Sequence, residues 1–483
     1  MRFQGFCHDR LKSRPEGAPD RQWSSTCGSG EWALGCIESA HRCTGGQGRP
    51  RRRIVEAIDP CYATPSPPLP GALQKALAAQ GISRLYTHQV ESLDRVRNGE
   101  NIVVVTATSS GKTLCYNLPI LESILNDRSA RAIYVYPINA LVNDQLKSLF
   151  RLNVELGAEA VSVARYTGSL NSGQRRLIRE RSPNILLTNP EMLHLSFLLW
   201  HQNWEELWGN LRYIVVDEVH TYRGVFGSNM AQLFRRMLRM ARHYGSAPQC
   251  IFCSATIANP KELAETLTGL PFSVVDRDGA GRGRRYFALW NPPLLDNQAS
   301  NIRRSYAEES VDLMLHCMRA NYNTIVFTRA RQLTERMLRL SRTVTDQTAE
   351  GDLADRISSY RAGYLAEERE DIENKLKGGD IQGIITTNAL EMGIDIGGLD
   401  AAIISGNDYV YLATGRARRA SRAGGADFPR RLAESAGPVL YASPAGVFCP
   451  APRAGHHRPE QPTHSVKALA VCGAGTALVA CGD

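Results

Sequence analysis

Two short stretches of this chain carry residue types that could hold a phosphate group and its metal ion. The first is the loop TATSSGKT, residues 106–113, which follows the apolar run NIVVV and opens a helical stretch. A strand, a loop of small residues and Gly-Lys-Thr at a helix N-terminus are typical of a phosphate cradle, because backbone N–H groups there point at the ligand. Lys112 would neutralise phosphate charge, and the Thr113 hydroxyl would bind Mg²⁺. Ala107 replaces the first glycine of the strict pattern, so the loop taken alone could also be a serine-rich turn.

The second stretch is a pair of carboxylates, Asp217 and Glu218, at the end of the apolar run RYIVV. Parallel α/β sheets place ligand chemistry at the carboxyl ends of their strands, so we expect both side chains at a site. Asp217 would hold Mg²⁺, and Glu218 would orient and deprotonate an attacking water. An acidic strand end is common on any protein surface. In combination with the Gly-Lys-Thr loop, however, the pair favours nucleotide hydrolysis.

The chain around these motifs alternates between short apolar runs and helical patterns, which predicts parallel α/β sheets covered on both faces. In the first unit, residues 54–290, we expect strands at 101–105, 131–136, 161–165, 184–188, 212–217 and 249–255. The loop at 276–285, rich in Gly and Arg, and the prolines after it indicate a boundary. The second unit, 300–406, has only about three expected strands, at 323–327, 383–387 and 400–405, so we predict a truncated sheet with an unpaired edge.

The flanking segments 1–53 and 407–483 are rich in Gly, Pro, Arg and Ser without sustained periodicity, and we expect them to be disordered. They hold the whole net charge of +9, since residues 54–406 contain 38 basic and 38 acidic side chains. Bulk charge therefore gives no evidence of nucleic-acid binding in the central part. The chain has no run of about 18 apolar residues and no apolar N-terminal region, which predicts a cytoplasmic protein without membrane contact.

An ordered set of motifs resembles that of the DEAD/DEAH-type superfamily-two helicases. Asp-Glu-Val-His at 217–220 is similar to the family's motif II, and Ser-Ala-Thr at 254–256 to motif III. The other pieces are YTHQ at 86–89, PINALVNDQ at 137–145, YTGS at 166–169, TNPEML at 188–193, IVFTRAR at 325–331 and TTNALEMGIDIG at 386–397. The last piece, with YRAGY at 360–364, looks most like the DNA-repair branch that carries a C-terminal cysteine-rich domain, a domain that we do not expect in this sequence.

This resemblance, which covers residues 60–406, implies tandem RecA-like domains with ATP and Mg²⁺ between them and single-stranded DNA as the favoured partner. The implied ATP-binding residues are Gln89, which reads the adenine, and Thr108, Ser109, Ser110, Gly111, Lys112 and Thr113. Lys112, Asp217 and Glu218 are implied as catalytic, with Mg²⁺ on Thr113 and Asp217. The residues implied in coupling the two sites are His220, Ser254, Thr256 and Asp395. The implied nucleic-acid contacts, largely independent of base sequence, are Pro137, Asn139, Gln145, Thr167, Gly168, Thr188, Pro190, Thr328, Thr387 and Asn388.

Two further clusters favour ordinary structural roles. The arginines at 175, 176, 179 and 181 are more typical of a solvated helix face than of a strand-binding surface. Trp200, Trp204 and Trp208 are spaced four residues apart, which favours helix packing over base stacking.

The family closes its active site with motif VI, whose arginines stabilise charge on the γ-phosphate. The resemblance predicts Trp-Gln-Gln-Ala-Gly-Arg-Ala-Gly-Arg soon after Gly406, but the chain reads LATGRARRASRAGG at 412–425. The codons TGG CAA CAG GCC GGG CGC GCC GGG CGA GCC encode the expected residues, and the same bases read one frame over, after a preceding C, encode Leu412–Ser421. We therefore hypothesise that the reading frame slips between Gly406 and Leu412 and makes 407–483 an aberrant tail. Without these arginines we expect weak or no ATPase activity from the chain as written.

Two alternatives stay open at this point. The chain could bind ATP or nucleic acid without turnover, or it could be an RNA helicase. Stimulation of ATPase activity by a strand would separate an enzyme from a binding remnant. Competition between single-stranded DNA and RNA would identify the strand, because no reader of the 2′-hydroxyl is evident in the sequence.

Overall fold

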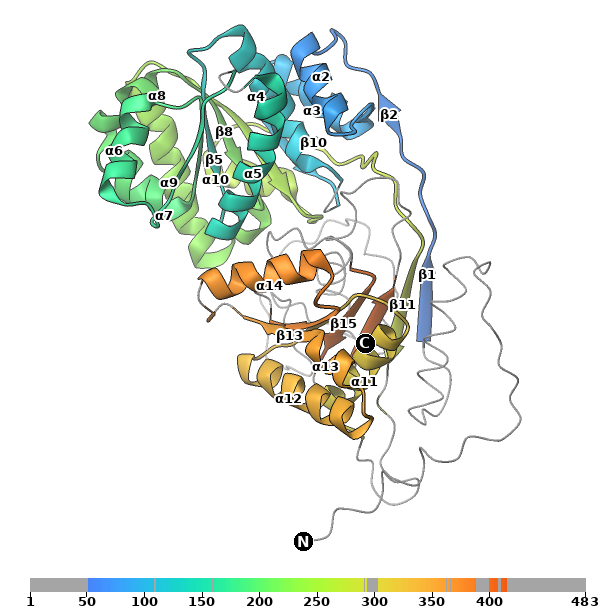
Figure 1. Cartoon of the computed structure of the whole chain (residues 1–483). Helices are drawn as coiled ribbons and strands as arrows, with labels where there is room; N and C mark the ends of the chain where they lie inside the picture. The colour runs from blue at the N-terminus through green and yellow to red at the C-terminus, as the bar shows by residue number, and fades with distance from the viewer. Residues whose placement is uncertain are drawn as a thin grey trace, which may run out of the picture.

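The computed structural model describes residues 51–414, apart from 108–109, 158–159, 291, 293–302, 362, 365, 388–398 and 407–409. It contains two units, each built on its own large sheet. Figure 1 shows them one above the other, with β1 (Arg51–Val55) and β11 (Arg285–Trp290) running along one side. The predicted α/β class, with two sheets in tandem, is confirmed.

The first sheet has seven parallel strands. Their order is β10 (Ser273–Val275), β4 (Ile102–Val105), β9 (Gln249–Ser254), β8 (Leu211–Val216), β5 (Arg131–Val135), β7 (Ile185–Thr188) and β6 (Val163–Tyr166). All six strands expected in this unit are present. β6 begins at Val163 rather than at 161, and the short strand β10 is additional to those expected.

Helices cover both faces of this sheet. On one face the core includes residues of α2 (Gly71–Ala79), α3 (Thr87–Arg97), α4 (Lys112–Asn126) and α5 (Asn139–Leu156), and on the other residues of α8 (Glu205–Gly209), α9 (Gly224–His243) and α10 (Pro260–Thr268). Successive side chains of β4 alternate between the two cores: Ile102 and Val104 pack on the first face, and Val103 and Val105 on the second. A strand that is buried on both faces reads as a continuous apolar run, which is why these strands are evident in the sequence.

Shorter elements complete the first unit. They are α6 (Ser172–Arg181), α7 (Pro190–Met192), the π-helical turn η1 (Leu193–Leu198), the 3₁₀ turns η2 (His201–Trp204) and η3 (Val219–Thr221), and the small antiparallel pair β2 (Tyr62–Ala63) and β3 (Leu85–Tyr86). Trp204 and Trp208 are buried, so the packing role predicted for them is confirmed. Trp200 differs, since 59% of it is exposed.

The second sheet also has seven strands, in the order β1, β11, β16 (Val410–Thr414), β15 (Ala401–Ser405), β12 (Thr324–Phe327), β14 (Gly383–Thr386) and β13 (Ile357–Tyr360). The last four are parallel to one another, and β1, β11 and β16 pair antiparallel. The helices of this unit are α11 (Tyr306–Arg319), α12 (Arg331–Gln347), α13 (Gly351–Asp355) and α14 (Ala366–Gly378). Strand β11 lies in this second sheet, although the sequence places the boundary between the units after residue 290.

Four strands of the second sheet, β1, β11, β13 and β16, are not among those expected from the sequence. β11 begins at the end of the segment 276–285, which the sequence marks as a boundary. The run of β13, Ile-Ser-Ser-Tyr, contains two serines and lacks the apolar signal of its neighbours. Strands β1 and β16 lie at the ends of the segments 1–53 and 407–483, for which the sequence predicts no structure. β16 pairs with β15, so the expected unpaired edge is not seen at β15. The run Val-Tyr-Leu-Ala-Thr of β16 contains β-branched and aromatic residues, which favour a strand wherever a partner is available.

Among the described residues, no helix combines the length and the apolar character that crossing a bilayer would need.

Candidate active site

Three neighbouring strands of the first sheet end at the same edge and bring the predicted chemistry together. β9 lies between β4 and β8, and all three are parallel. Val105 pairs with Ser254, and Val216 pairs with Phe252, so the strands end at nearly the same level. The loop of residues 106–113, from here on the phosphate loop, follows β4. Ser-Ala-Thr (254–256) stands at the end of β9, and the carboxylate pair follows β8. The two stretches predicted to handle phosphate and metal are therefore separated by a single strand.

The phosphate loop is held in place by its own hydroxyls and by the opposite strand. Gly111 caps α4 with φ of 77°, a conformation that favours glycine. The hydroxyls of Thr106 and Ser110 are hydrogen-bonded at 2.6 Å. The Lys112 Nζ atom donates to the Ser254 backbone oxygen at 3.0 Å, which places the ammonium group across the edge from the loop. Thr108 and Ser109, two of the expected ATP-binding residues, lie outside the described residues.

Gln89 lies at the start of α3 and contacts the phosphate loop directly. Its Nε2 atom donates to the Gly111 oxygen at 3.1 Å, and its Oε1 atom accepts from the Tyr86 N–H at 2.9 Å. A Cβ atom on Gly111 would lie 2.5 Å from Gln89 Nε2, so a side chain at 111 would displace the glutamine. Beside this contact, the rings of Tyr86 and Tyr62 stack with centroids 5.3 Å apart. The position predicted to read the adenine thus also supports the loop that would hold the phosphates.

The carboxylate pair forms a tight and strained turn. Asp217 and Glu218 are both buried, and Glu218 has φ of 52°, which is unusual for a residue other than glycine. Such a conformation typically costs about 1–3 kcal/mol and occurs most often at functional sites. The Asp217 Oδ1 atom accepts the Glu218 N–H at 2.8 Å. The turn therefore holds two carboxylates out of bulk water at the strand end, near Lys112.

His220 connects the carboxylate turn to the Ser-Ala-Thr turn. Its Nδ1 atom accepts the Ala255 N–H at 3.4 Å and lies 3.3 Å from Glu218 Oε2. Burial, followed by the charges of Lys112 and Arg223, lowers the pKa of His220 to about 4. The ring is therefore neutral at pH 7, and its approach to Glu218 is not an ion pair.

The other expected coupling residues differ in their surroundings. Ser254 is fully buried and offers its backbone oxygen to Lys112, whereas Thr256 is exposed. Asp395 lies outside the described residues.

The side chains at this edge fit a magnesium ion. Mg²⁺ prefers hard oxygen ligands and is usually held by one or two carboxylates together with the phosphates of a substrate. The Thr113 hydroxyl and the Asp217 carboxylate are oxygen donors of this kind. The described residues contain no cluster of three or more His, Cys, Asp or Glu side chains that would make a metal site on its own.

The neighbouring strands β5, β7 and β6 end at the same edge and bring the expected strand contacts of the first unit together. Asn139, at the start of α5, accepts from Asn189 Nδ2 at 2.8 Å. The Thr167 hydroxyl is 2.9 Å from the Ser169 hydroxyl. Thr188 is buried, and its hydroxyl donates to the Tyr166 oxygen, which ties β7 to β6. Pro137 follows β5, Pro190 is the buried first residue of α7, and Gln145 lies within α5.

The arginines of α6 support this edge. Arg175 donates to the Gly168 oxygen at 2.9 Å, and Arg179 donates to the Tyr166 hydroxyl at 3.1 Å. These contacts go beyond the solvated helix face predicted from the sequence, because they fix the loop that contains Thr167 and Gly168. Arg176 does behave as predicted, since it is exposed and pairs with Glu180.

In the second unit, Thr328 and Thr387 follow the paired strands β12 and β14. The Thr328 hydroxyl lies 2.7 Å from the Thr334 hydroxyl and 3.2 Å from the Thr386 oxygen. Asn388, also an expected contact, lies outside the described residues.

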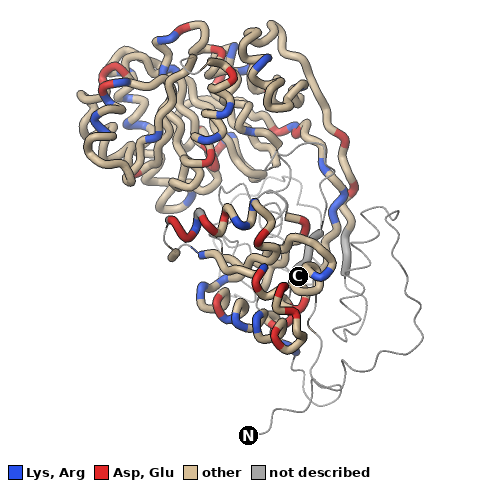
Figure 2. The backbone as a smooth tube through the Cα atoms, viewed as in Figure 1, with Lys and Arg blue, Asp and Glu red and all other residues tan. Residues whose placement is uncertain are grey.

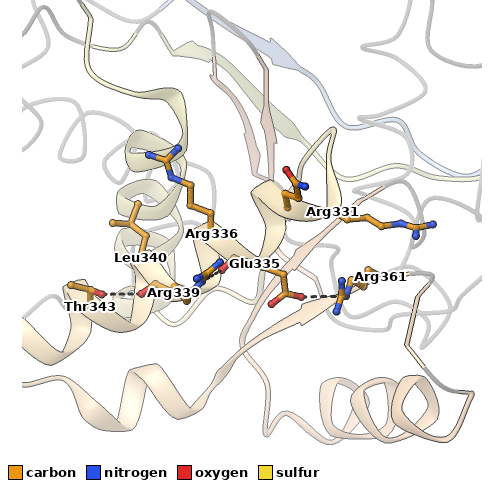
Figure 3. A pocket seen from close by; sticks show the side chains of 8 residues that line it. Arg331, Glu335, Arg336, Arg339, Leu340, Thr343 and Arg361 are labelled. Carbon is orange, nitrogen blue, oxygen red and sulfur yellow. Dashed lines mark hydrogen bonds and ion pairs between the residues drawn. The ribbon is translucent and has the colours of Figure 1, made fainter.

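A basic groove runs along α12 of this unit (Figure 3). It has a volume of about 770 Å³ and is lined by Arg331, Gln332, Glu335, Arg336, Arg339, Leu340, Thr343 and Arg361. Glu335 is its single acidic side chain and pairs with Arg361 at 3.3 Å. Basic and acidic residues are mixed along the backbone of both units (Figure 2), whereas the lining of this groove contains four arginines and one glutamate. The basic character of this helix is evident in the sequence, but no sequence pattern assigns it a role.

Two families match this chain. The DEAD/DEAH box helicase family matches residues 86–263, and the helicase conserved C-terminal domain matches residues 307–425. The ATP-dependent helicase YprA of Bacillus subtilis, described as uncharacterized, is 45% identical over 335 residues, which are 69% of this chain and 44% of that protein. The ATP-dependent helicase hrq1 of Schizosaccharomyces pombe is 37% identical over 358 residues, 73% of this chain and 34% of that protein.

A solved structure agrees with these sequence matches. The crystal structure of the DUF1998 helicase MrfA bound to DNA and AMPPNP aligns with a TM-score of 0.71 at 40% identity, covering 77% of this chain and 51% of that one. The tandem RecA-like arrangement is therefore confirmed. The chain spans about half the length of these relatives or less.

Proposed function

Because this chain belongs to the DEAD/DEAH-box superfamily-two helicases, in the branch of MrfA and Hrq1, we propose that it uses the hydrolysis of Mg-ATP to move along a nucleic-acid strand. The observation that carries this proposal is the convergence of the phosphate loop and the carboxylate pair on either side of β9. Such an edge can receive a triphosphate from one side and place a hydrolytic water on the other.

The residues of this edge have distinct roles in the proposed reaction. Lys112 and the loop N–H groups would bind the β- and γ-phosphates. Gln89 would contact the adenine and, through the Gly111 oxygen, would support the loop. Thr113 and Asp217 would hold Mg²⁺, which would supply positive charge to offset the negative charge that develops on the phosphates. Glu218 would accept a proton from the attacking water. Glu218 is buried, and its Oε2 atom lies 3.3 Å from His220 Nδ1.

His220 and Ser254 would communicate between the nucleotide and the strand. His220 contacts the Ala255 N–H, and Lys112 contacts the Ser254 oxygen, so both links cross from the nucleotide residues to the turn after β9. Movement of either partner during hydrolysis would shift this turn. The shift would reach the strand contacts through the parallel strands of the same edge.

We propose single-stranded DNA as the strand, in a repair process. The relative with 40% identity is a helicase bound to DNA, whereas the RNA-bound Mss116 structures are 15% identical and support the fold alone. Backbone oxygens and small polar groups at the ends of β5, β6 and β7 would contact sugar and phosphate without reading bases. The basic groove of α12 would extend this contact over the second unit, because arginine is suited to binding phosphate groups.

The alternative, a chain that binds ATP or nucleic acid without turnover, is favoured by one observation. The arginines expected after Gly406 are absent from the sequence in their usual spacing. The nucleotide-binding side can still be complete in such a chain. Its turnover would be low, because the loss of an arginine finger typically costs about 10³–10⁵ in rate.

The experiment is to measure ATP turnover of the full chain with and without single-stranded DNA, and binding of AMPPNP in parallel. Stimulation by DNA supports the helicase. Binding of AMPPNP without turnover supports the impaired alternative. Absence of both would refute the proposed nucleotide site. RNA of the same length as competitor then identifies the preferred strand.

A further inference from the structure

The segment between the two units, residues 276–285, lies against the phosphate loop. We propose that Asp278 and His88 are positioning residues that clamp this connector to the phosphate loop, so that nucleotide affinity and exposure of the connector change together. The inference rests on the proposed function only in taking ATP as the ligand of the loop. Neither residue is placed to touch the nucleotide; both act through the backbone of the loop.

The clamp holds the loop from both of its sides. The Ala107 N–H, at the start of the loop, donates to Asp278 Oδ2 at 3.3 Å. The Ser110 oxygen, just before Gly111, lies 2.9 Å from His88 Nε2. Asp278 and His88 are themselves neighbours, with 4.0 Å between Oδ1 and Nδ1. One pair of side chains thus holds one backbone atom on each side of the loop.

The tautomer of His88 follows from its fixed partners. The Gly279 N–H donates to Nδ1 at 3.2 Å, so Nδ1 must be the acceptor. The Ser110 oxygen can only accept, so Nε2 must carry the proton. Burial lowers the pKa of His88, and the opposing effects of Asp278 and Ser110 are smaller. The neutral ring therefore joins the phosphate loop to the connector as a donor on one side and an acceptor on the other.

Asp278 stays charged in this position. Burial raises its pKa, but the Ala280 N–H and Arg282 outweigh that effect and lower it. The Ala280 N–H donates to Oδ1 at 2.9 Å, and Arg282 pairs with Oδ2. The carboxylate therefore organises the turn of the connector as well as the loop.

The packing around Gly279 leaves no room for a side chain at this point. A Cβ atom at 279 would lie 2.9 Å from both the Cys61 oxygen and the Thr87 nitrogen. The Cys61 N–H donates to the Gly279 oxygen at 2.8 Å. Only glycine lets the connector approach the start of α3 closely enough to reach His88.

The connector continues directly into the second sheet. The backbones of Arg282 and Ile58 form an isolated antiparallel β-bridge, and β11 then pairs with β1. At the far end, the Trp290 Nε1 atom donates to the buried Glu309 at 2.8 Å. A change at the phosphate loop is thus connected by hydrogen bonds to the core of the second unit. Because such coupling is reciprocal, a nucleotide that orders the loop stabilises the clamp, and the clamp favours nucleotide binding.

The test compares Asp278→Ala with Asp276→Ala in the full chain. Asp276 is an exposed acidic residue of the same connector, so its replacement is a matched control. AMPPNP affinity is measured by titration calorimetry, and the connector is probed by limited trypsin cleavage after Arg282, Arg284 and Arg285. We expect Asp278→Ala to bind AMPPNP about tenfold more weakly. We also expect faster cleavage of this variant without nucleotide, and no protection when AMPPNP is added. In the control, AMPPNP should slow cleavage as in the unaltered chain.

Two further variants separate the clamp from a general loss of structure. Gly279→Ala leaves every charge unchanged but pushes the connector away, so it should behave like Asp278→Ala. Asp278→Asn keeps an oxygen that can accept the Ala107 N–H, so it should restore part of the affinity. Far-UV circular dichroism checks that each variant is folded.

The outcomes distinguish this inference from the proposed function. Equal affinity and equal cleavage of Asp278→Ala and the control would overturn the clamp. Failure of the unaltered chain to bind AMPPNP would overturn the proposed nucleotide site instead, and the cleavage rates without nucleotide would still show whether the clamp exists.

Discussion

Lys112 and Ser254 are joined by a 3.0 Å hydrogen bond from the lysine ammonium to the serine backbone oxygen. The bond links the phosphate loop after β4 to the turn after β9. A triphosphate in the loop would attract the same ammonium group more strongly than a neutral carbonyl does. Binding would therefore release the turn after β9, which gives that turn a way to respond to the nucleotide.

Replacement of Lys112 by alanine should strongly weaken nucleotide binding while leaving the fold intact. The side chain is partly exposed and makes its described contact with a backbone atom, so little packing is lost. We expect AMPPNP affinity to fall at least about 100-fold, because a charge-assisted contact to phosphate is removed. Lys261→Ala, on the exposed surface of α10, is the control. Retention of tight binding by Lys112→Ala would contradict the assigned phosphate loop.

Replacement of Glu218 by glutamine should separate binding from hydrolysis. The amide has nearly the same shape and can keep the buried position, but it cannot take a proton from water. We expect AMPPNP affinity within about twofold of the unaltered chain and turnover lower by about 10²–10⁴. Calorimetry measures the AMPPNP affinity. Phosphate release measures the turnover, and the substitution is made in a chain whose own turnover is measurable. Unchanged turnover would show that another group activates the water.

The basic groove on α12 should contribute to strand binding. Arg336 and Arg339 line it, whereas Arg342, on the same helix and also exposed, does not. We expect Arg336→Ala/Arg339→Ala to weaken binding of labelled single-stranded DNA about tenfold. The slope of log affinity against log salt should become shallower by about 1.4, since each lost phosphate contact changes it by about 0.7. Arg342→Ala should leave both quantities unchanged. Equal effects of the two variants would show that only general charge matters.

His220 should make the protein less stable in mild acid. Its pKa is lowered to about 4 in the folded chain, from the ordinary 6.5. Between these values the unfolded chain binds a proton that the folded chain excludes, so stability falls as pH drops from 6.5 toward 4. At pH 5 the loss amounts to about 2 kcal/mol.

Urea unfolding at pH 7.5 and pH 5 measures this contribution. His220→Gln lacks the titrating ring, so its unfolding midpoint should fall less between the two pH values than that of the unaltered chain. Parallel shifts of both proteins would show that His220 is not responsible.

Restoring the reading frame should restore turnover. Sequencing the gene across codons 400–425 tests the proposed slip directly. A gene corrected to encode the expected motif after Gly406 should give DNA-stimulated ATPase activity about 10³–10⁵ higher, the usual contribution of an arginine finger. An error-free gene in the present frame, with full activity, would refute the hypothesis.

The first unit can be predicted well from the sequence because its signals are local. Inner strands of that sheet, such as β4, β5 and β7, are buried on both faces, so apolar runs such as Ile-Val-Val-Val mark them directly. The motifs stand at the ends of those runs, and parallel strands must bring such ends to one edge. For this reason the positions of Lys112, Asp217 and Glu218 along the chain are enough to place them together.

The second unit and the clamp could not be predicted in the same way. Strand β13 contains two serines, and β1 begins with three arginines, so neither has an apolar run. Asp278 stands in a loop of Gly and Arg that reads as a boundary, and its contact with Ala107 spans 171 positions of the chain. Only tertiary structure reveals such pairs, because no local pattern records which distant atom will be the partner.

The pairing of β1 with β11 also has a consequence for synthesis on the ribosome. Arg51 emerges first, yet its partner strand begins only at Arg285. At roughly 5–20 residues per second, β1 waits on the order of 10 to 50 seconds with its hydrogen-bonding groups open to any other strand. The first unit can fold during that delay, but the second sheet cannot close until the nascent chain has passed the connector. A ribosome that stalls before that point would therefore release a chain with one folded unit and an unpaired strand in front of it.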